Sequence, residues 1–231
     1  MKTVVFLCFW LLYVRYALCK SPSSSSKMKS PMNVYEFLWD NNTDIANETI
    51  HVDFLIQMQS GSLQAERYVN FTIQDIHYVL NVTDMLSNMS AKVNQPSDLK
   101  IFFKGIHSSY TFFADLMLQQ YCFKGAPPIQ QTLAMRKYLS FYRNLMDSEE
   151  PIYFAVGLLP CYRLWVWLGN TLNTPPTNAY YTWKVEIMGK YPEESLKALL
   201  NKYLDTPEKV AKANGIFRTQ MQNEHDFFLS S

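Results

Sequence analysis

Apolar residues recur at helical spacing through most of the chain, and this periodicity limits the folds that it can adopt. Between residues 66 and 89 they repeat at a period close to 3.6 residues, as on the buried face of a helix. The 231 residues include only 7 glycines, too few for the many tight turns of a sandwich or barrel. Because no repeat and no hairpin turn between alternating strands occurs, we expect an all-α protein, a single helical bundle of seven or eight helices.

Capping and helix-breaking residues indicate where the helices begin and end. Gly61 ends the first segment, and Ser97 and Thr206 are candidate N-caps. Asp147 or Ser148 is the candidate cap of the most apolar segment, which we expect to be the central buried helix. Helices are predicted at about 35–61, 66–89, 97–121, 130–146, 151–172, 179–188, 192–204 and 207–228.

The first residues resemble a targeting sequence. Lys2 precedes an apolar run, and Ala17 and Cys19 are small residues that suit a cleavage site, so residues 1–19 are predicted to be a signal peptide. Arg15 interrupts the run, which is shorter than the roughly 20 apolar residues of a membrane span. The alternatives are a buried first helix and an uncleaved membrane anchor. With cleavage, we expect a secreted or luminal protein without stable membrane insertion, a disordered linker at 20–32 rich in Ser, Lys and Pro, and a folded domain at 33–231.

Five N-glycosylation sequons support the secretory route. We expect two or three of them to be occupied, because some lie on helix faces that packing would bury. The five acceptors are Asn41, Asn47, Asn70, Asn81 and Asn88.

The charge balance excludes one large class of partners. Lys and Arg number 21 against 20 Asp and Glu, and loss of Lys2 and Arg15 with the signal would leave 19 against 20, a net charge of −1. A near-neutral chain without a basic excess is not expected to bind nucleic acid. The mature chain keeps only Cys122 and Cys161, which either pair with each other or remain free.

Cys161 lies in the most informative stretch, between Gly157 and Gly169. Pro160 precedes it inside an apolar helical run and should kink the helix, and Trp165 follows one turn later on the same face. A thiol beside an aromatic wall suits attack on a flat ring. The alternative is a cysteine buried as a small hydrophobic residue.

Four motifs in order resemble those of the TenA family (thiaminase II, or aminopyrimidine aminohydrolase), and this chain resembles a secreted, eukaryotic-type member. The family shares a helical fold with haem oxygenase and PQQ-synthesis protein C. Order and spacing agree from about residue 34 to 228. The motifs are Leu158-Leu-Pro-Cys161, Gln74-Asp-Ile-His-Tyr78, Tyr180-Tyr-Thr-Trp183 and Glu224-His-Asp-Phe-Phe228.

The resemblance implies roles for particular residues. Cys161 matches the family's nucleophile and Glu224 its acid–base carboxylate. Asp75 matches the aspartate that hydrogen-bonds the aminopyrimidine, while Tyr78 and Phe227 match aromatic residues that contact the ring. The chemistry is consistent, since a carboxylate accepts from the ring's amine and a carboxylic acid activates the ring for attack.

Other positions are less settled or depart from the family pattern. Tyr138 matches a tyrosine near the nucleophile, unless a one-residue insertion shifts the match to Lys137. Trp165 stands where the family usually has tyrosine, which keeps a stacking surface in the substrate site but loses the hydroxyl. Ile187 replaces a second tyrosine.

The predicted function is hydrolysis of thiamin or thiamin-derived aminopyrimidines to hydroxymethylpyrimidine through the cysteine nucleophile. The alternative is a secreted, non-catalytic binding protein for an aminopyrimidine or another flat aromatic ligand. The partner is thus a small molecule, no metal or other cofactor is required, and the resemblance implies a homo-oligomer, either tetramer or dimer.

Overall fold

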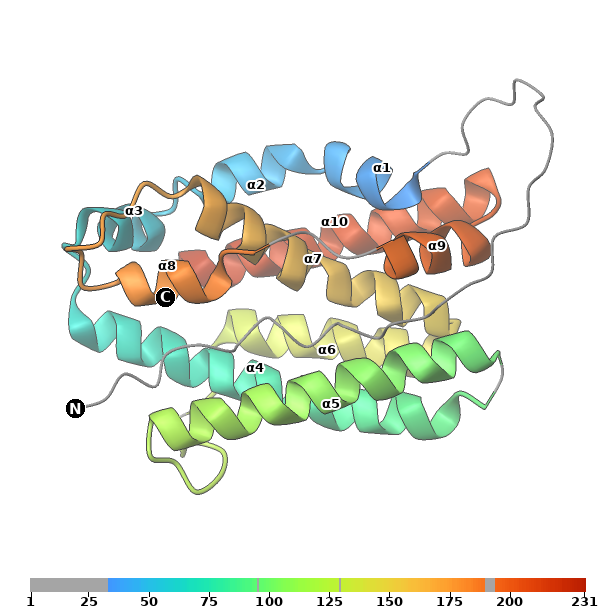
Figure 1. The fold of residues 1–231 in the computed structure, drawn as a ribbon, viewed down its shortest axis with the longest axis horizontal. Coiled ribbons are helices and arrows are strands. Elements are labelled where there is room, and N and C mark those ends of the chain that lie inside the picture. Colours follow the sequence, from blue (N-terminus) through green and yellow to red (C-terminus); the bar gives the residue numbers. More distant parts are fainter. Residues whose placement is uncertain (1–32, 95, 129, 190–193) are drawn as a thin grey trace.

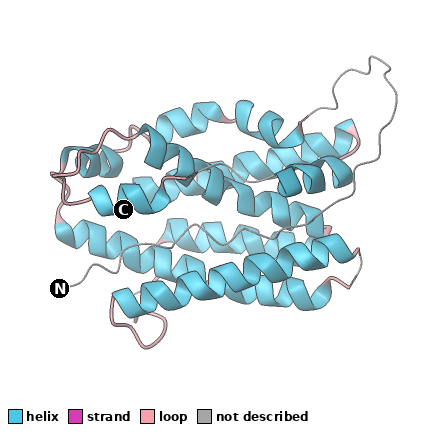
Figure 2. Cartoon of the chain, viewed as in Figure 1, coloured by secondary structure: helices cyan, strands magenta, loops and turns pink. Residues whose placement is uncertain are grey.

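The computed structural model of the chain describes residues 33–94, 96–128, 130–189 and 194–231. The predicted signal peptide and linker lie outside the described residues. The described residues form helices joined by loops, without a strand (Figure 2), which confirms the all-α prediction. The helices are α1 (Val34–Asp40), α2 (Thr43–Thr49), α3 (Asp53–Ser60), α4 (Ala65–Lys92), α5 (Ser97–Gln120), α6 (Leu133–Ser148), α7 (Pro151–Thr171), α8 (Tyr181–Ile187), α9 (Glu194–Tyr203) and α10 (Pro207–Leu229).

The helix count exceeds the predicted seven or eight because the first predicted segment is broken into α1, α2 and α3. At the first break the backbone of Asn42 leaves helical geometry, with φ −134°. The buried Asn42 amide donates to Leu38 O at 2.7 Å and to Asn214 Oδ1 at 2.9 Å. The break is therefore anchored to α10, while the other seven predicted segments correspond one to one to α4–α10.

Two predicted caps were wrong and one is confirmed. Thr206 caps α10, its hydroxyl accepting from Lys209 N at 3.3 Å. Ser97 is instead the first residue of α5, which follows an extended Pro96. Asp147 and Ser148 belong to α6. Glu150 is the N-cap of α7 because a residue before proline favours extended backbone.

α7 is the central helix, in contact with α6, α8, α9 and α10 (Figure 1). It continues through Pro160 from Pro151 to Thr171. Among the described helices it alone is long and apolar enough to cross a membrane, but 78% of the qualifying window is buried inside the bundle. That burial is typical of a core helix.

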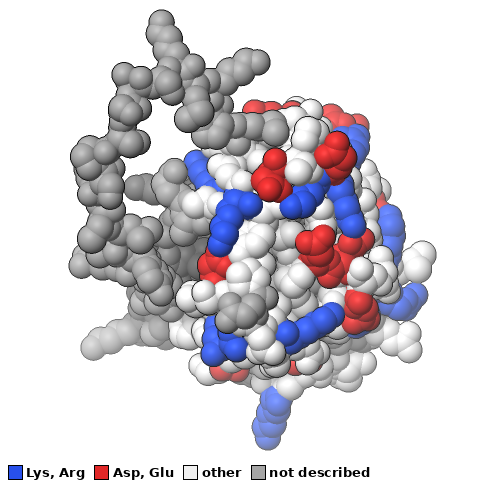
Figure 3. All heavy atoms as spheres, turned by 90° about the vertical axis from the view of Figure 1, so that its right-hand side faces the viewer, with Lys and Arg blue, Asp and Glu red and all other residues white. Residues whose placement is uncertain are grey.

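Figure 1 shows α4 and α5 running side by side along one edge of the bundle, with α6 beside α4 and α10 beside α7. The surface of this bundle carries basic and acidic side chains interspersed on the face shown in Figure 3. Neither sign dominates that face.

The sequons differ in their accessibility. Asn81 is half-buried on α4: its amide donates to His77 O and accepts from Arg143, both at 2.8 Å. An engaged amide is a poor acceptor for a glycan. The other four acceptors are exposed: Asn41, Asn47, Asn70 and Asn88.

Candidate active site

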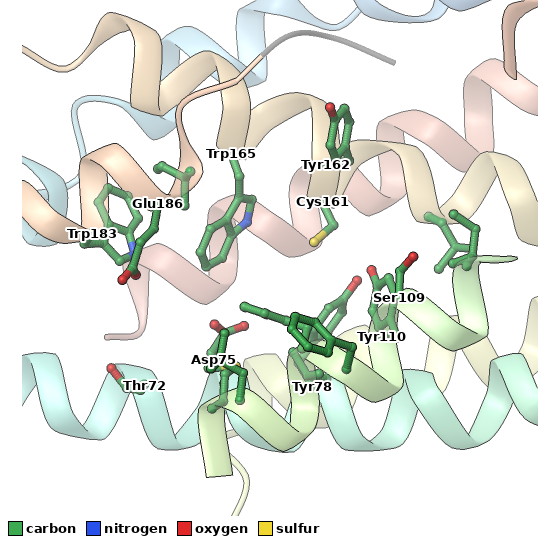
Figure 4. A pocket seen from close by; sticks show the side chains of 18 of the residues that line it. Thr72, Asp75, Tyr78, Ser109, Tyr110, Cys161, Tyr162, Trp165, Trp183 and Glu186 are labelled. Carbon is green, nitrogen blue, oxygen red and sulfur yellow. The ribbon is translucent and has the colours of Figure 1, made fainter. Parts of the chain in front are cut away.

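A cavity of about 230 Å³ opens between α4, α5, α7 and α8. Its wall is mostly aromatic and aliphatic, with a few polar side chains that converge on the interior (Figure 4). A space of this kind suits a small, flat, mainly apolar ligand held by a few directional contacts. Its aromatic lining includes Tyr68, Phe71, Tyr78, Tyr110, Trp165 and Trp183.

Asp75 projects from α4 into the cavity. It shares one face of the helix with Phe71, Tyr78 and Val79, as their three- and four-residue spacing requires. The side chain is only 9% exposed, and no hydrogen bond or ion pair to its carboxyl occurs within the described part of the chain. Burial and the nearby negative charge of Glu224 raise the pKa of Asp75 to about 8. The resting group is a neutral acid with unused hydrogen-bonding capacity.

Cys161 enters the cavity from α7, on the opposite side from Asp75 (Figure 4). Burial, followed by the negative charge of Glu224, raises the pKa of the thiol well above its ordinary value. The sulfur is therefore a thiol at rest and requires a base to become a nucleophile.

Glu224 lies behind the cavity wall on α10 and is only 1% exposed. Its Oε1 accepts from the Tyr138 hydroxyl at 2.5 Å, and its Oε2 accepts from the Trp165 indole N–H at 3.0 Å. The Cys161 thiol lies near the same carboxyl, and each of the two groups shifts the pKa of the other. Burial raises the pKa of Glu224 to about 7, while the hydrogen bonds from Tyr138 and Trp165 and the nearby thiol oppose the rise. A carboxyl with a pKa near neutral pH, close to a thiol, is suited to proton transfer.

Trp165 therefore does more than supply the stacking surface expected of it. Its ring stacks near Phe71, with the centroids 6.0 Å apart, while its N–H holds Glu224. The indole thus provides a hydrogen-bond donor at the position where the resemblance described above implies a hydroxyl.

A network of tyrosine hydroxyls lies beside this group. The Tyr78 and Tyr142 oxygens are 2.9 Å apart, and those of Tyr142 and Tyr138 are 3.4 Å apart. Sequence reasoning missed Tyr142 and also Tyr110, which lines the cavity. The spacing of Tyr138 and Tyr142, one turn apart on α6, was an available signal for Tyr142; Tyr110 had none.

Besides Glu224, two other predicted residues do not line the cavity. Tyr138 reaches it only through Glu224 and the tyrosine network. Phe227, expected to contact a bound ring, is buried and stacks on Phe71 at 4.9 Å, and Phe71 is the cavity residue. The alternative match to Tyr138, Lys137, pairs instead with Asp226 at 2.8 Å, with more than half of its side chain exposed.

α8 contributes the remaining wall. Ile187 is buried against Gly169 of α7, where an added Cβ would lie 2.7 Å from Ile187 Cγ1. Glu186, which sequence reasoning missed, lines the cavity beside Trp183. In Figure 4 the carboxylates of Glu186 and Asp75 lie on the Trp165 side of the cavity.

Cys122 and Cys161 are not paired with each other. Both thiols are free, with Cys122 exposed at the end of α5. Among the described residues, no group of three or more His, Cys, Asp or Glu side chains is placed to hold a metal ion.

These observations define a class of protein: a helical bundle that encloses an aromatic cavity with a thiol and buried carboxyls. The chain belongs to the TENA/THI-4/PQQC family, whose sequence model matches residues 39–231. No curated protein sequence matches the chain significantly.

Solved structures share the fold. A TenA homologue from Pyrococcus furiosus superposes with a TM-score of 0.70 at 16% identity, covering 84% of this chain and 98% of that one. A TenA homologue from P. horikoshii OT3 gives 0.69 at 20% identity, covering 85% and 97%. A TenA family transcription regulator from Silicibacter sp. TM1040 gives 0.73 at 14%, covering 88% and 98%. At these identities the likeness extends to the fold, and the chemistry must be argued from this chain's own residues.

Proposed function

We propose that this protein hydrolyses the exocyclic C–N bond of thiamin or a thiamin-derived 4-aminopyrimidine. The observation that carries the proposal is the arrangement of one buried acid, Asp75, across an aromatic cavity from a thiol, Cys161, that lies near a second buried carboxyl, Glu224. Family membership supports a hydrolase of this general type.

Asp75 suits the edge of an aminopyrimidine. With a pKa of about 8 it carries its proton near neutral pH. It can donate that proton to a ring nitrogen while accepting a hydrogen bond from the neighbouring amine. The aromatic wall, including Trp165 and Phe71, contacts the ring.

Cys161 and Glu224 perform the bond changes. The sulfur adds to the ring carbon next to the one that bears the exocyclic methylene, while Glu224 takes the thiol proton and relays it to the adjacent ring nitrogen. The electron pair of the ring amine then expels the leaving group, whose nitrogen keeps the electrons of the broken C–N bond. Water adds its oxygen to the methylene and gives up a proton; the S–C bond then breaks, and the proton on the ring nitrogen returns to sulfur.

A non-catalytic binding protein is the second candidate. The raised pKa of the Cys161 thiol favours it, because a thiol without an effective base would leave the ligand intact. The proximity of Glu224, a carboxyl with a pKa of about 7, to Cys161 favours the hydrolase instead.

The test is incubation of the purified protein with thiamin and, separately, with 4-amino-5-aminomethyl-2-methylpyrimidine, followed by mass spectrometry for hydroxymethylpyrimidine. Cys161→Ser should abolish product and leave the melting temperature nearly unchanged. Cys122→Ser is the matched control, since that thiol is exposed and lies outside the cavity lining, and it should retain full turnover. Ligand binding without product in the wild-type protein would establish the binding protein.

We further propose that the chain acts in the secretory pathway and as a homo-oligomer with a small-molecule ligand. The exposure of Asn41, Asn47, Asn70 and Asn88 supports the first point. A mobility shift on endoglycosidase treatment of the secreted protein tests it, and sedimentation velocity tests the second.

A further inference from the structure

The charges around the cavity favour one kind of ligand. Two of its lining side chains are carboxyls, Asp75 and Glu186, and the lining residues within the described ranges include no Lys, Arg or His. An anionic ligand would meet the Glu186 carboxylate without a cation to pair with, which is costly in an apolar enclosure, and the neutral Asp75 offers it no compensating positive charge. A neutral or cationic ligand meets no such penalty.

Glu186 is available to such a ligand. It is half-buried on α8, and burial raises its pKa above the ordinary value. Among described residues its carboxylate has neither a hydrogen bond nor an ion pair. The nearest basic residue along the helix, Lys184, is committed elsewhere, since its ammonium donates to Leu172 O at 2.5 Å.

Asp75 and Glu186 lie at different places in the cavity and would therefore contact different parts of a bound ligand. Asp75 comes from α4, whereas Glu186 comes from α8 beside Trp183, on the far side of Trp165 from Cys161 (Figure 4). In the binding mode proposed above, with the ring at Asp75 and its reactive carbon at Cys161, a substituent directed toward α8 would lie on the side of the cavity where Glu186 stands.

We propose that Glu186 is a specificity-determining residue that binds a positively charged leaving group, either a protonated amine or a quaternary azolium, and excludes phosphorylated substrates. This inference rests on the proposed function for the identity of the ring and names the class of leaving group at the same site. The positive charge on an azolium nitrogen disappears as its C–N bond breaks. Glu186 therefore stabilises the bound substrate at least as much as the transition state, and its loss should raise KM more than it lowers kcat.

The experiment compares Glu186→Gln with Glu66→Gln, an exposed acid at the start of α4. A half-buried charge-assisted contact predicts that Glu186→Gln raises KM for thiamin about tenfold while kcat falls less than about threefold. The Kd for hydroxymethylpyrimidine, which has no cationic substituent, should change less than about twofold. The ratio of kcat/KM for thiamin monophosphate to that for thiamin should rise about tenfold, and Glu66→Gln should change none of these values.

An equal loss of affinity for thiamin and for the neutral product would overturn the assignment, as would an unchanged KM. Failure of the proposed function is distinguishable, because it appears as absence of turnover in the wild-type protein. Calorimetry then still tests Glu186: selective loss of thiamin affinity in Glu186→Gln supports the charge contact, and absence of wild-type binding to either ligand refutes both proposals.

Discussion

Replacing Asp75 with Asn should stabilise the protein while impairing its binding site. The carboxyl is buried without a partner in the described chain, and its pKa rises from 3.8 to about 8 on folding. Between these values the unfolded chain releases a proton that the folded protein retains. The free energy of unfolding therefore falls as the pH rises through this window.

The magnitude follows from the pKa difference. At pH 7, which is about three pH units above the pKa of Asp75 in the unfolded chain, the folded protein still keeps the proton on this carboxyl. Each unit corresponds to about 1.36 kcal/mol, so keeping the proton lowers the free energy of unfolding by about 4 kcal/mol. The Asn amide of the variant would also be buried without all of its hydrogen bonds, and this cost offsets about half of the ~4 kcal/mol gained by removing the carboxyl. We expect a net gain of about 2 kcal/mol, equivalent to a melting temperature about 4–8 °C higher at pH 7.

The assay is thermal and urea unfolding of wild type, Asp75→Asn and the control Asp84→Asn between pH 5 and 8. Asp84 is an exposed acid on the same helix, and its replacement should change stability by less than about 0.5 kcal/mol. Asp75→Asn should flatten the decline of stability with pH and weaken aminopyrimidine binding by about 100-fold. A lower melting temperature, or an unchanged pH dependence, would refute the reasoning.

Two further substitutions test the contacts that shape the site. Trp165→Phe keeps an aromatic ring but removes the indole donor to Glu224. The pKa of Glu224 should therefore rise from about 7 by about one unit, which moves the acidic limb of the pH profile of kcat/KM to higher pH. An acidic limb that does not move would contradict the role of Glu224 as the proton acceptor. Gly169→Ala places a Cβ 2.7 Å from Ile187 Cγ1 and 2.9 Å from Met188 N. Because backbone must shift, unfolding should become easier by about 1–3 kcal/mol in denaturant titration, and a neutral effect would mean that α8 moves freely.

Much of the architecture could be predicted from the sequence because helical periodicity is a local property. Seven predicted segments match α4–α10, and Thr206 caps α10 as expected. The break at Asn42 escaped prediction because its amide is held partly by Asn214, 172 positions away. A local sequence pattern does not reveal a hydrogen-bond partner that is so distant along the chain.

The sequence by itself determined the helical class, the family motifs and the candidate residues Asp75, Cys161 and Glu224. Only the tertiary structure decided how these groups meet. Glu224 receives the Trp165 N–H from 59 positions away and the Tyr138 hydroxyl from 86, while Phe227 packs behind Phe71. Periodicity shows which face of a helix is buried, but the neighbour against which it packs depends on the crossing of whole helices, and that crossing sets which side chains reach the cavity.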